Sequence, residues 1–152
     1  DEILEGFDTR FKVTPPLRTE TDRQALLNGI KDGTIDLITS DHNPIDIEFK
    51  KMEFDTAKNG TIGLESAFGA LLTVLPLETV IEKLTVGKSI FGIKNYSITE
   101  GSKANFTLFN PEGKATFTTA NILSKSKNSA FLGTEIQGSV YGILNQNQLV
   151  TK

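Results

Sequence analysis

The chain contains no cysteine among its 152 residues. This absence excludes disulfide bonds, thiolate metal sites and a cysteine nucleophile, and it fits a cytoplasmic protein. Histidine occurs once, as His42. A Ser–His–Asp triad is excluded as well, because Asp41 and His42 are adjacent and their side chains point in different directions from a strand end.

An excess of charge of one sign is also missing, since the net charge is only -3. No basic patch with interleaved aromatic residues occurs, which argues against nucleic-acid binding. The longest apolar stretch, 67–77, is too short to span a bilayer and is broken by Pro76. We therefore expect neither a membrane span nor a signal peptide, and a chain of this length is able to bury the core of one domain.

The first forty residues have the pattern of an extended segment, a helix and a buried strand. An extended segment over 11–14 is stopped by two prolines. A helix follows, with Thr19 or Thr21 as its N-cap and Gly33 as its end. The apolar run 35–39 predicts a buried strand. Together these elements predict a βαβ-like unit and hence a parallel sheet.

The middle of the chain combines a long irregular segment with apolar helices. Residues 42–63 lack periodicity, and a loop of this length in a compact domain is usually functional. The apolar pattern then predicts a helix over 64–75, a second from Leu77 or Glu78 to Leu84, and a short third helix that is capped by Thr85 and ends at Phe91.

The residue pattern changes near Asn95, after which short β-prone segments alternate with turn residues. Asn145-Gln146-Asn147 predicts a hairpin turn. The expected strands are Phe106–Phe109, Ala115–Thr119, Ser139–Leu144 and Leu149–Thr151. We therefore expect an α/β part over 1–95 and a small β part over 96–152.

Asp41 is the strongest functional candidate, because it lies just beyond the predicted strand 35–39, with only Ser40 between them. In α/β barrels the catalytic side chains project from the C-terminal ends of the strands. A carboxylate there can bind a metal ion or shuttle a proton. The alternative, which composition alone favours, is that Asp41 merely caps the next turn.

Six short motifs occur in one collinear order. They are Pro15-Pro16-Leu17-Arg18, Asp32-Gly33-Thr34-Ile35-Asp36, Ser40-Asp41-His42-Asn43-Pro44, Gly60-Thr61-Ile62-Gly63-Leu64-Glu65, Gly101-Ser102-Lys103-Ala104-Asn105-Phe106 and Ser124-Lys125-Ser126-Lys127-Asn128. The ordered set resembles the dihydroorotases of the amidohydrolase superfamily, which interconvert carbamoyl aspartate and dihydroorotate. The resemblance implies the C-terminal part of a (β/α)8 barrel over 1–95 and part of a β-sandwich over 96–152.

The resemblance also implies roles for five residues. Asp41 corresponds to an aspartate that binds a metal ion and acts as the general base. Many dihydroorotases have a substrate-binding asparagine at the position of Thr14 and a histidine at that of Ile45. Threonine offers one hydroxyl there and isoleucine no polar group. Asn59 and Gly60 match a place where backbone groups bind the substrate, although an ordinary turn glycine explains Gly60 equally well.

Two further polar residues are expected to be structural. The histidine that corresponds to His42 is not a principal metal ligand in the family, so we expect a hydrogen-bonded structural role. Arg18 would suit a substrate carboxylate. The family's main carboxylate-binding arginine comes from earlier strands, however, so we expect Arg18 to form a structural ion pair or to anchor a loop.

The implied cofactor is zinc in a binuclear site, whose other ligands lie upstream of this sequence in the family. We therefore expect a piece of a longer polypeptide, inactive alone, whose parent acts on dihydroorotate or carbamoyl aspartate. Because sheet edges and helix faces would be exposed, we expect a homo-oligomer, a rearranged fold, or contacts that replace the lost part of the barrel. One alternative is a non-catalytic scaffold for a partner such as aspartate transcarbamoylase. Another is an independent β-rich binding domain, which would lack adjacent parallel strands ending near Thr14 and Asp41.

Overall fold

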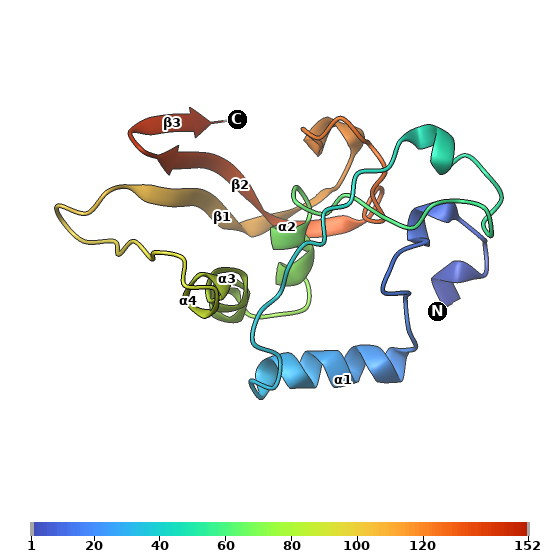
Figure 1. The fold of residues 1–152 in the computed structure, drawn as a ribbon, viewed down its shortest axis with the longest axis horizontal. Coiled ribbons are helices and arrows are strands. Elements are labelled where there is room, and N and C mark those ends of the chain that lie inside the picture. Colours follow the sequence, from blue (N-terminus) through green and yellow to red (C-terminus); the bar gives the residue numbers. More distant parts are fainter. Residues whose placement is uncertain (1, 152) are drawn as a thin grey trace.

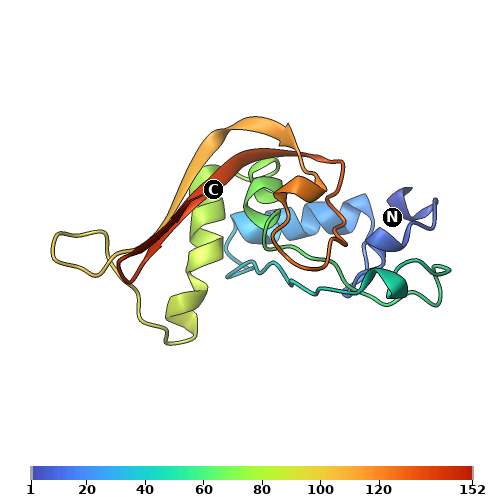
Figure 2. The same cartoon turned by 90° about the horizontal axis from the view of Figure 1, so that it is seen from above.

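The computed structural model describes residues 2–151 and has an α/β fold, in which four helices precede a three-stranded sheet (Figure 1). The helices and strands are α1 (Glu20–Lys31), α2 (Ala67–Leu72), α3 (Leu77–Thr85), α4 (Gly87–Ile90), β1 (Asn105–Thr116), β2 (Glu135–Asn145) and β3 (Gln148–Thr151). Short 3-10 helices cover Glu2–Leu4, Thr9–Phe11, Ile47–Phe49 and Thr119–Asn121. In Figure 2 the long strands curve over α2 and α3.

The predicted first helix is confirmed as α1, and its N-terminus is a capping box. Thr19 Oγ1 accepts a hydrogen bond from the backbone N–H of Asp22, and the Asp22 carboxylate accepts one from the backbone N–H of Thr19. Thr19, rather than Thr21, is therefore the cap. The helix ends at Lys31, and Gly33 follows with a φ of +84°, a conformation that glycine adopts at little cost.

The predicted strand 35–39 does not form in residues 2–151, and no parallel pairing is found there. The segment is instead anchored to the end of α3. The backbone N–H of Ile38 donates to Lys83 O, and the buried Lys83 Nζ donates to Ile35 O, both at 2.9 Å. A buried parallel strand needs neighbours on both sides to pair its backbone, and this part of the chain supplies none. The extended segment expected over 11–14 likewise joins no sheet in the described residues, and its first residue, Phe11, ends the 3-10 helix Thr9–Phe11.

The helices after residue 63 are confirmed, with shorter bounds for the first and the third. Thr85 does not cap the third helix, because it is the last residue of α3 and Val86 is the N-cap of α4. Turns replace both ends of the helix expected over 64–75, which leaves α2. Leu72, Leu75 and Val80 form the core between α2 and α3. Leu27 of α1 and Ile38 pack against this core, which places the segment before Asp41 on the helical layer.

The C-terminal part is an antiparallel sheet in the order β1-β2-β3. Gln146 and Asn147 connect β2 to β3 with φ values of +47° and +67°. Positive φ at both central residues is the geometry of a type I′ turn, so the predicted hairpin is confirmed.

A second core of Ile62, Phe117 and Ile122 joins the middle of the chain to the segments that flank the 3-10 helix Thr119–Asn121. Gly69 lets α2 approach β2 closely, since a Cβ atom there would lie 2.9 Å from Ile136 Cδ1. This core therefore fixes the segment around Ile62 against the C-terminal part.

Within residues 2–151, no helix combines the length and the apolarity needed to cross a membrane.

Candidate active site

Asp41 lies in a tightly held turn. Its φ is +42°, which is uncommon for a residue other than glycine, and its side chain is exposed. On one side, a Cβ atom added to Gly63 would lie 2.5 Å from Ser40 O. On the other side, the backbone N–H of Asn43 donates to Thr61 O at 2.9 Å. The residues around Asp41 are therefore packed against 61–63.

Among residues 2–151, no hydrogen bond or ion pair of the Asp41 carboxylate is found, and the next 3-10 helix has Asp46 as its N-cap. Asp41 therefore does not cap a turn in this part of the chain. Backbone strain of this kind costs about 1–3 kcal/mol and concentrates at functional sites. An exposed carboxylate on a strained, well-anchored turn is suited to act on an external molecule.

Thr14 and Asn59, two predicted substrate positions, are brought together by the fold. Asn59 Nδ2 donates to Thr14 Oγ1 at 2.6 Å, although the two residues are far apart in the sequence. The Thr14 hydroxyl is therefore already engaged within the chain.

Gly60 and Ile45, the other two predicted substrate positions, are in direct contact. Gly60 has a φ of +142°, and a Cβ atom there would lie 2.8 Å from both Asn43 Nδ2 and Ile45 Cγ1. Its N–H donates to Lys12 O and its carbonyl accepts from Asn128 Nδ2, both at 3.0 Å. The backbone N–H and carbonyl of Gly60 thus already have partners inside the chain.

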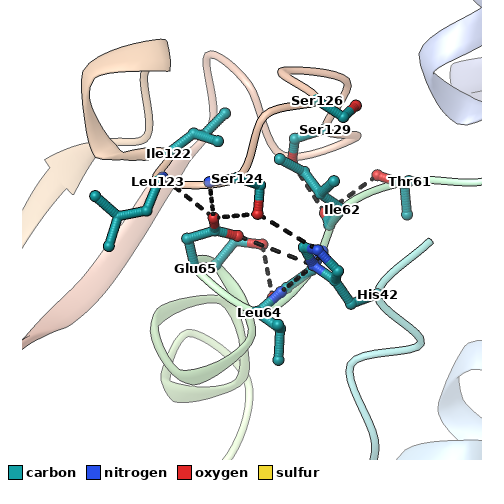
Figure 3. A network of polar contacts seen from close by, with 12 residues as sticks. His42, Thr61, Ile62, Leu64, Glu65, Ile122, Leu123, Ser124, Ser126 and Ser129 are labelled. Atoms are coloured by element: carbon teal, nitrogen blue, oxygen red, sulfur yellow. Dashed lines mark hydrogen bonds and ion pairs between the residues drawn. The ribbon is translucent and has the colours of Figure 1, made fainter. Parts of the chain in front are cut away.

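His42 is hydrogen-bonded at both ring nitrogens, as expected for a structural histidine (Figure 3). Its Nδ1 accepts the backbone N–H groups of Gly63 and Leu64, each at 3.2 Å. Its Nε2 lies 3.4 Å from Ser124 Oγ. Because Nδ1 accepts, this hydrogen-bond pattern assigns the proton of the neutral ring to Nε2.

Glu65 completes this network from the start of the segment that leads into α2. Its Oε1 accepts three hydrogen bonds: from Ser124 Oγ at 2.5 Å, from Ser124 N at 2.7 Å and from Leu123 N at 3.2 Å. Burial opposes ionisation, but the hydrogen bonds from Ser124 outweigh it and hold the pKa of the Glu65 carboxyl below its usual value of 4.5. Its Oε2 is buried without a hydrogen-bond partner and lies 4.0 Å from His42 Nδ1.

The residues described here do not fit a complete zinc site. No group of three or more His, Cys, Asp or Glu able to hold a metal ion occurs in residues 2–151, whereas a catalytic zinc site has three protein ligands. Both ring nitrogens of His42 already have partners within the chain. Asp41 is the one sequence-predicted ligand, and it offers a single carboxylate.

Sequence reasoning found Asp41 and His42 but assigned no role to Glu65 or Ser124. Both residues lie inside motifs that support the family resemblance, 60–65 and 124–128. Their place in these motifs is the sequence feature that could have marked them as candidates. Arg18 forms an ion pair with Asp22 in which Arg18 Nε and Asp22 Oδ2 are 3.4 Å apart, as predicted for a structural arginine.

Sequence comparison relates the chain to the C-terminal part of dihydroorotases. The dihydroorotase of Caldicellulosiruptor saccharolyticus is 38% identical over 159 residues, which cover 100% of this chain and 37% of that protein. The dihydroorotase of Geobacter metallireducens is 39% identical over 145 residues, which cover 91% of this chain and 34% of that protein. The chain thus spans little more than a third of these relatives. No protein-family model matches it.

Solved structures with the same fold are hydantoinases. An L-hydantoinase (dihydropyrimidinase) from Arthrobacter aurescens matches with a TM-score of 0.84 and 22% identity over 99% of this chain and 36% of that chain. A D-hydantoinase (dihydropyrimidinase) from Thermus sp. matches with a TM-score of 0.76 and 23% identity over 95% of this chain and 36% of that chain. Residues 2–151 contain no parallel strands, but the similarity to dihydroorotases over the whole chain argues against an independent β-rich domain.

Proposed function

Because this chain is related over its whole length to the C-terminal part of dihydroorotases, we propose that it forms the last part of a hydrolase that opens and closes cyclic amides. In this proposal residues 1–95 complete the barrel and residues 96–152 complete the β-sandwich. The proposed substrates of the complete protein are dihydroorotate and carbamoyl aspartate, and the proposed location is the cytoplasm.

The observation that carries the proposal is the state of Asp41. Its carboxylate is exposed on a strained turn, while the backbone on both sides is anchored to 61–63. In the hydrolytic direction Asp41 would take a proton from the attacking water while the water oxygen bonds to the ring carbonyl carbon. When the ring C–N bond breaks, the same carboxyl would return the proton to the leaving nitrogen.

The substrate would bind beside Asp41, along the cluster of Thr14, Ile45, Asn59 and Gly60. Two contacts bring these four positions together: the hydrogen bond between Asn59 and Thr14, and the close packing of Gly60 on Ile45. Zinc, the proposed cofactor, would act as a Lewis acid in the complete protein, and its remaining ligands would have to come from outside this chain.

The test compares the complete polypeptide that contains this sequence with the 152-residue chain. With zinc added, the complete protein should hydrolyse dihydroorotate, and Asp41→Asn should lower kcat by about 100-fold or more. The 152-residue chain should show no turnover. An Asp46→Asn variant, which changes an exposed carboxylate in the same loop, serves as the control and should keep its activity. Full activity of the Asp41→Asn protein would contradict the proposal.

A non-catalytic scaffold is the second candidate, and one observation favours it. The two positions that differ from the usual dihydroorotase residues already have partners within the chain: Thr14 accepts from Asn59, and Ile45 packs on Gly60. A polar substrate loses much affinity when such partners are absent. Under this alternative the complete protein would not turn over dihydroorotate, and it would co-purify with aspartate transcarbamoylase or as a homo-oligomer.

A further inference from the structure

We propose that Glu65 and Ser124 are positioning residues that fix the direction of the Asp41 carboxylate by holding the ring of His42. This inference rests on the proposed function, because it gives the network a role in catalysis. Neither residue touches the reacting atoms in this assignment. Both act through His42, the residue next to Asp41 in the chain.

The His42 ring is held from both ends (Figure 3). Two backbone N–H groups, of Gly63 and Leu64, converge on Nδ1, and Ser124 Oγ lies beside Nε2. With the proton on Nε2, the ring donates to Ser124, whose hydroxyl then donates to Glu65. The order of donors fixes both the tautomer and the orientation of the ring.

Asp41 lies between two immobilised neighbours, Ser40 and His42. Ser40 is packed tightly against Gly63, and the His42 ring is clamped on its other side. Asp41 itself has a φ of +42°, a conformation that relaxes readily when an adjacent anchor is lost. The orientation of the free carboxylate therefore depends on the anchor at His42.

Ser124 and Glu65 connect His42 to the C-terminal part of the chain. Ser124 is 82 residues from His42 in the sequence, and Glu65 fixes the Ser124 segment through three hydrogen bonds to one oxygen. The side chain of Glu65 is only 11% exposed, and that of His42 only 19%. The network thus couples the Asp41 turn to residues that follow β1, and it is shielded from water that would loosen it.

The experiment uses Ser124→Ala, Ser124→Thr and Ser129→Ala in the complete polypeptide. Ser129 is the matched control, since it is a buried serine nearby whose hydroxyl hydrogen-bonds backbone groups at Ile62 and Phe131 and not His42. A misplacement of about 1 Å costs on the order of 100-fold in rate, so Ser124→Ala should lower kcat by about 10- to 100-fold with little change in KM. Ser124→Thr keeps the hydroxyl and should restore most of kcat, and Ser129→Ala should leave kcat unchanged even if it lowers stability.

A second measurement keeps the inference separate from the proposed function. His42 is the only histidine, so long-range proton–nitrogen NMR spectra of the 152-residue chain in alkaline buffer report one imidazole. The wild-type ring should show a single Nε2–H tautomer, and Ser124→Ala or Glu65→Gln should produce a mixture of tautomers or a mobile ring. If the complete protein is inactive but the spectra show these expected changes, the proposed function fails, whereas the role of Glu65 and Ser124 in holding the His42 ring is upheld. A wild-type ring already averaged over both tautomers, or an unchanged kcat in Ser124→Ala, would overturn the inference.

Discussion

Asn59 donates a 2.6 Å hydrogen bond from its Nδ2 to the Oγ1 of Thr14, and so joins two loops whose residues are 45 positions apart in the chain. Both residues were singled out from the sequence for their relation to substrate. Their contact means that the Thr14 hydroxyl is oriented by a neighbour before any ligand arrives.

We expect a modest coupling between these two residues. Thr14→Val and Asn59→Ala should each destabilise the chain slightly, and a double-mutant cycle should give an interaction energy of about 0.5–1 kcal/mol. Urea unfolding of the wild type, both single variants and the double variant measures it. Strictly additive effects would show that the hydrogen bond contributes nothing to stability.

Gly60 should not tolerate a side chain, for two separate reasons. Its φ of +142° disfavours any other residue, and a Cβ atom would lie 2.8 Å from Asn43 and Ile45. Gly60→Ala should therefore lower the free energy of unfolding by about 3 kcal/mol. Gly113 also has a positive φ, +84°, but no heavy atom lies within 4 Å of its added Cβ. Gly113→Ala should thus cost only about 1 kcal/mol, and equal losses for the two variants would refute the packing argument.

The conformation of Asp41 should be visible in stability measurements. Because its φ is +42°, Asp41→Gly should be more stable than Asp41→Ala by about 1 kcal/mol. The same pair of substitutions at Asp46, whose φ is -63°, is the control and should show no advantage for glycine. Thermal or urea unfolding of the four variants decides the matter. Activity should be lost in both Asp41 variants of the complete protein, which separates strain from function.

The Glu65 carboxylate should make stability depend on pH in the acid range. Its pKa in the folded chain lies below 4.5, so near and below this pH the unfolded chain binds more protons than the folded chain. The contribution is therefore fully present above pH 4.5 and is lost as the pH falls through the lower pKa of the folded state. Unfolding free energies measured from neutral to acid pH should fall less steeply for Glu65→Gln than for the wild type. Ser124→Ala, which removes the hydroxyl that lowers this pKa, should give an intermediate slope.

Local sequence determined the elements that depend on near neighbours. The capping box at Thr19 and Asp22 sets the start of α1, and the turn at Gln146 and Asn147 joins β2 to β3. Cap and turn geometries are closed by residues two to four positions apart, so the sequence alone was sufficient to predict the turn and to limit the cap of α1 to Thr19 or Thr21. The collinear motifs likewise identified the relation to dihydroorotases, because motif order is a property of the sequence itself.

Tertiary structure decided what depends on distant partners. The run 35–39 has the composition of a buried strand, yet it joins no sheet in residues 2–151, because a strand forms only where a neighbouring strand completes its hydrogen bonds. The contacts of His42 with Ser124, and of Thr14 with Asn59, cross 82 and 45 positions respectively. The sequence by itself determined which side chains were available for the site, with Asp41 foremost. Only the packing of segments far apart in the chain decided which of them meet, because such contacts depend on the whole fold and leave no local pattern.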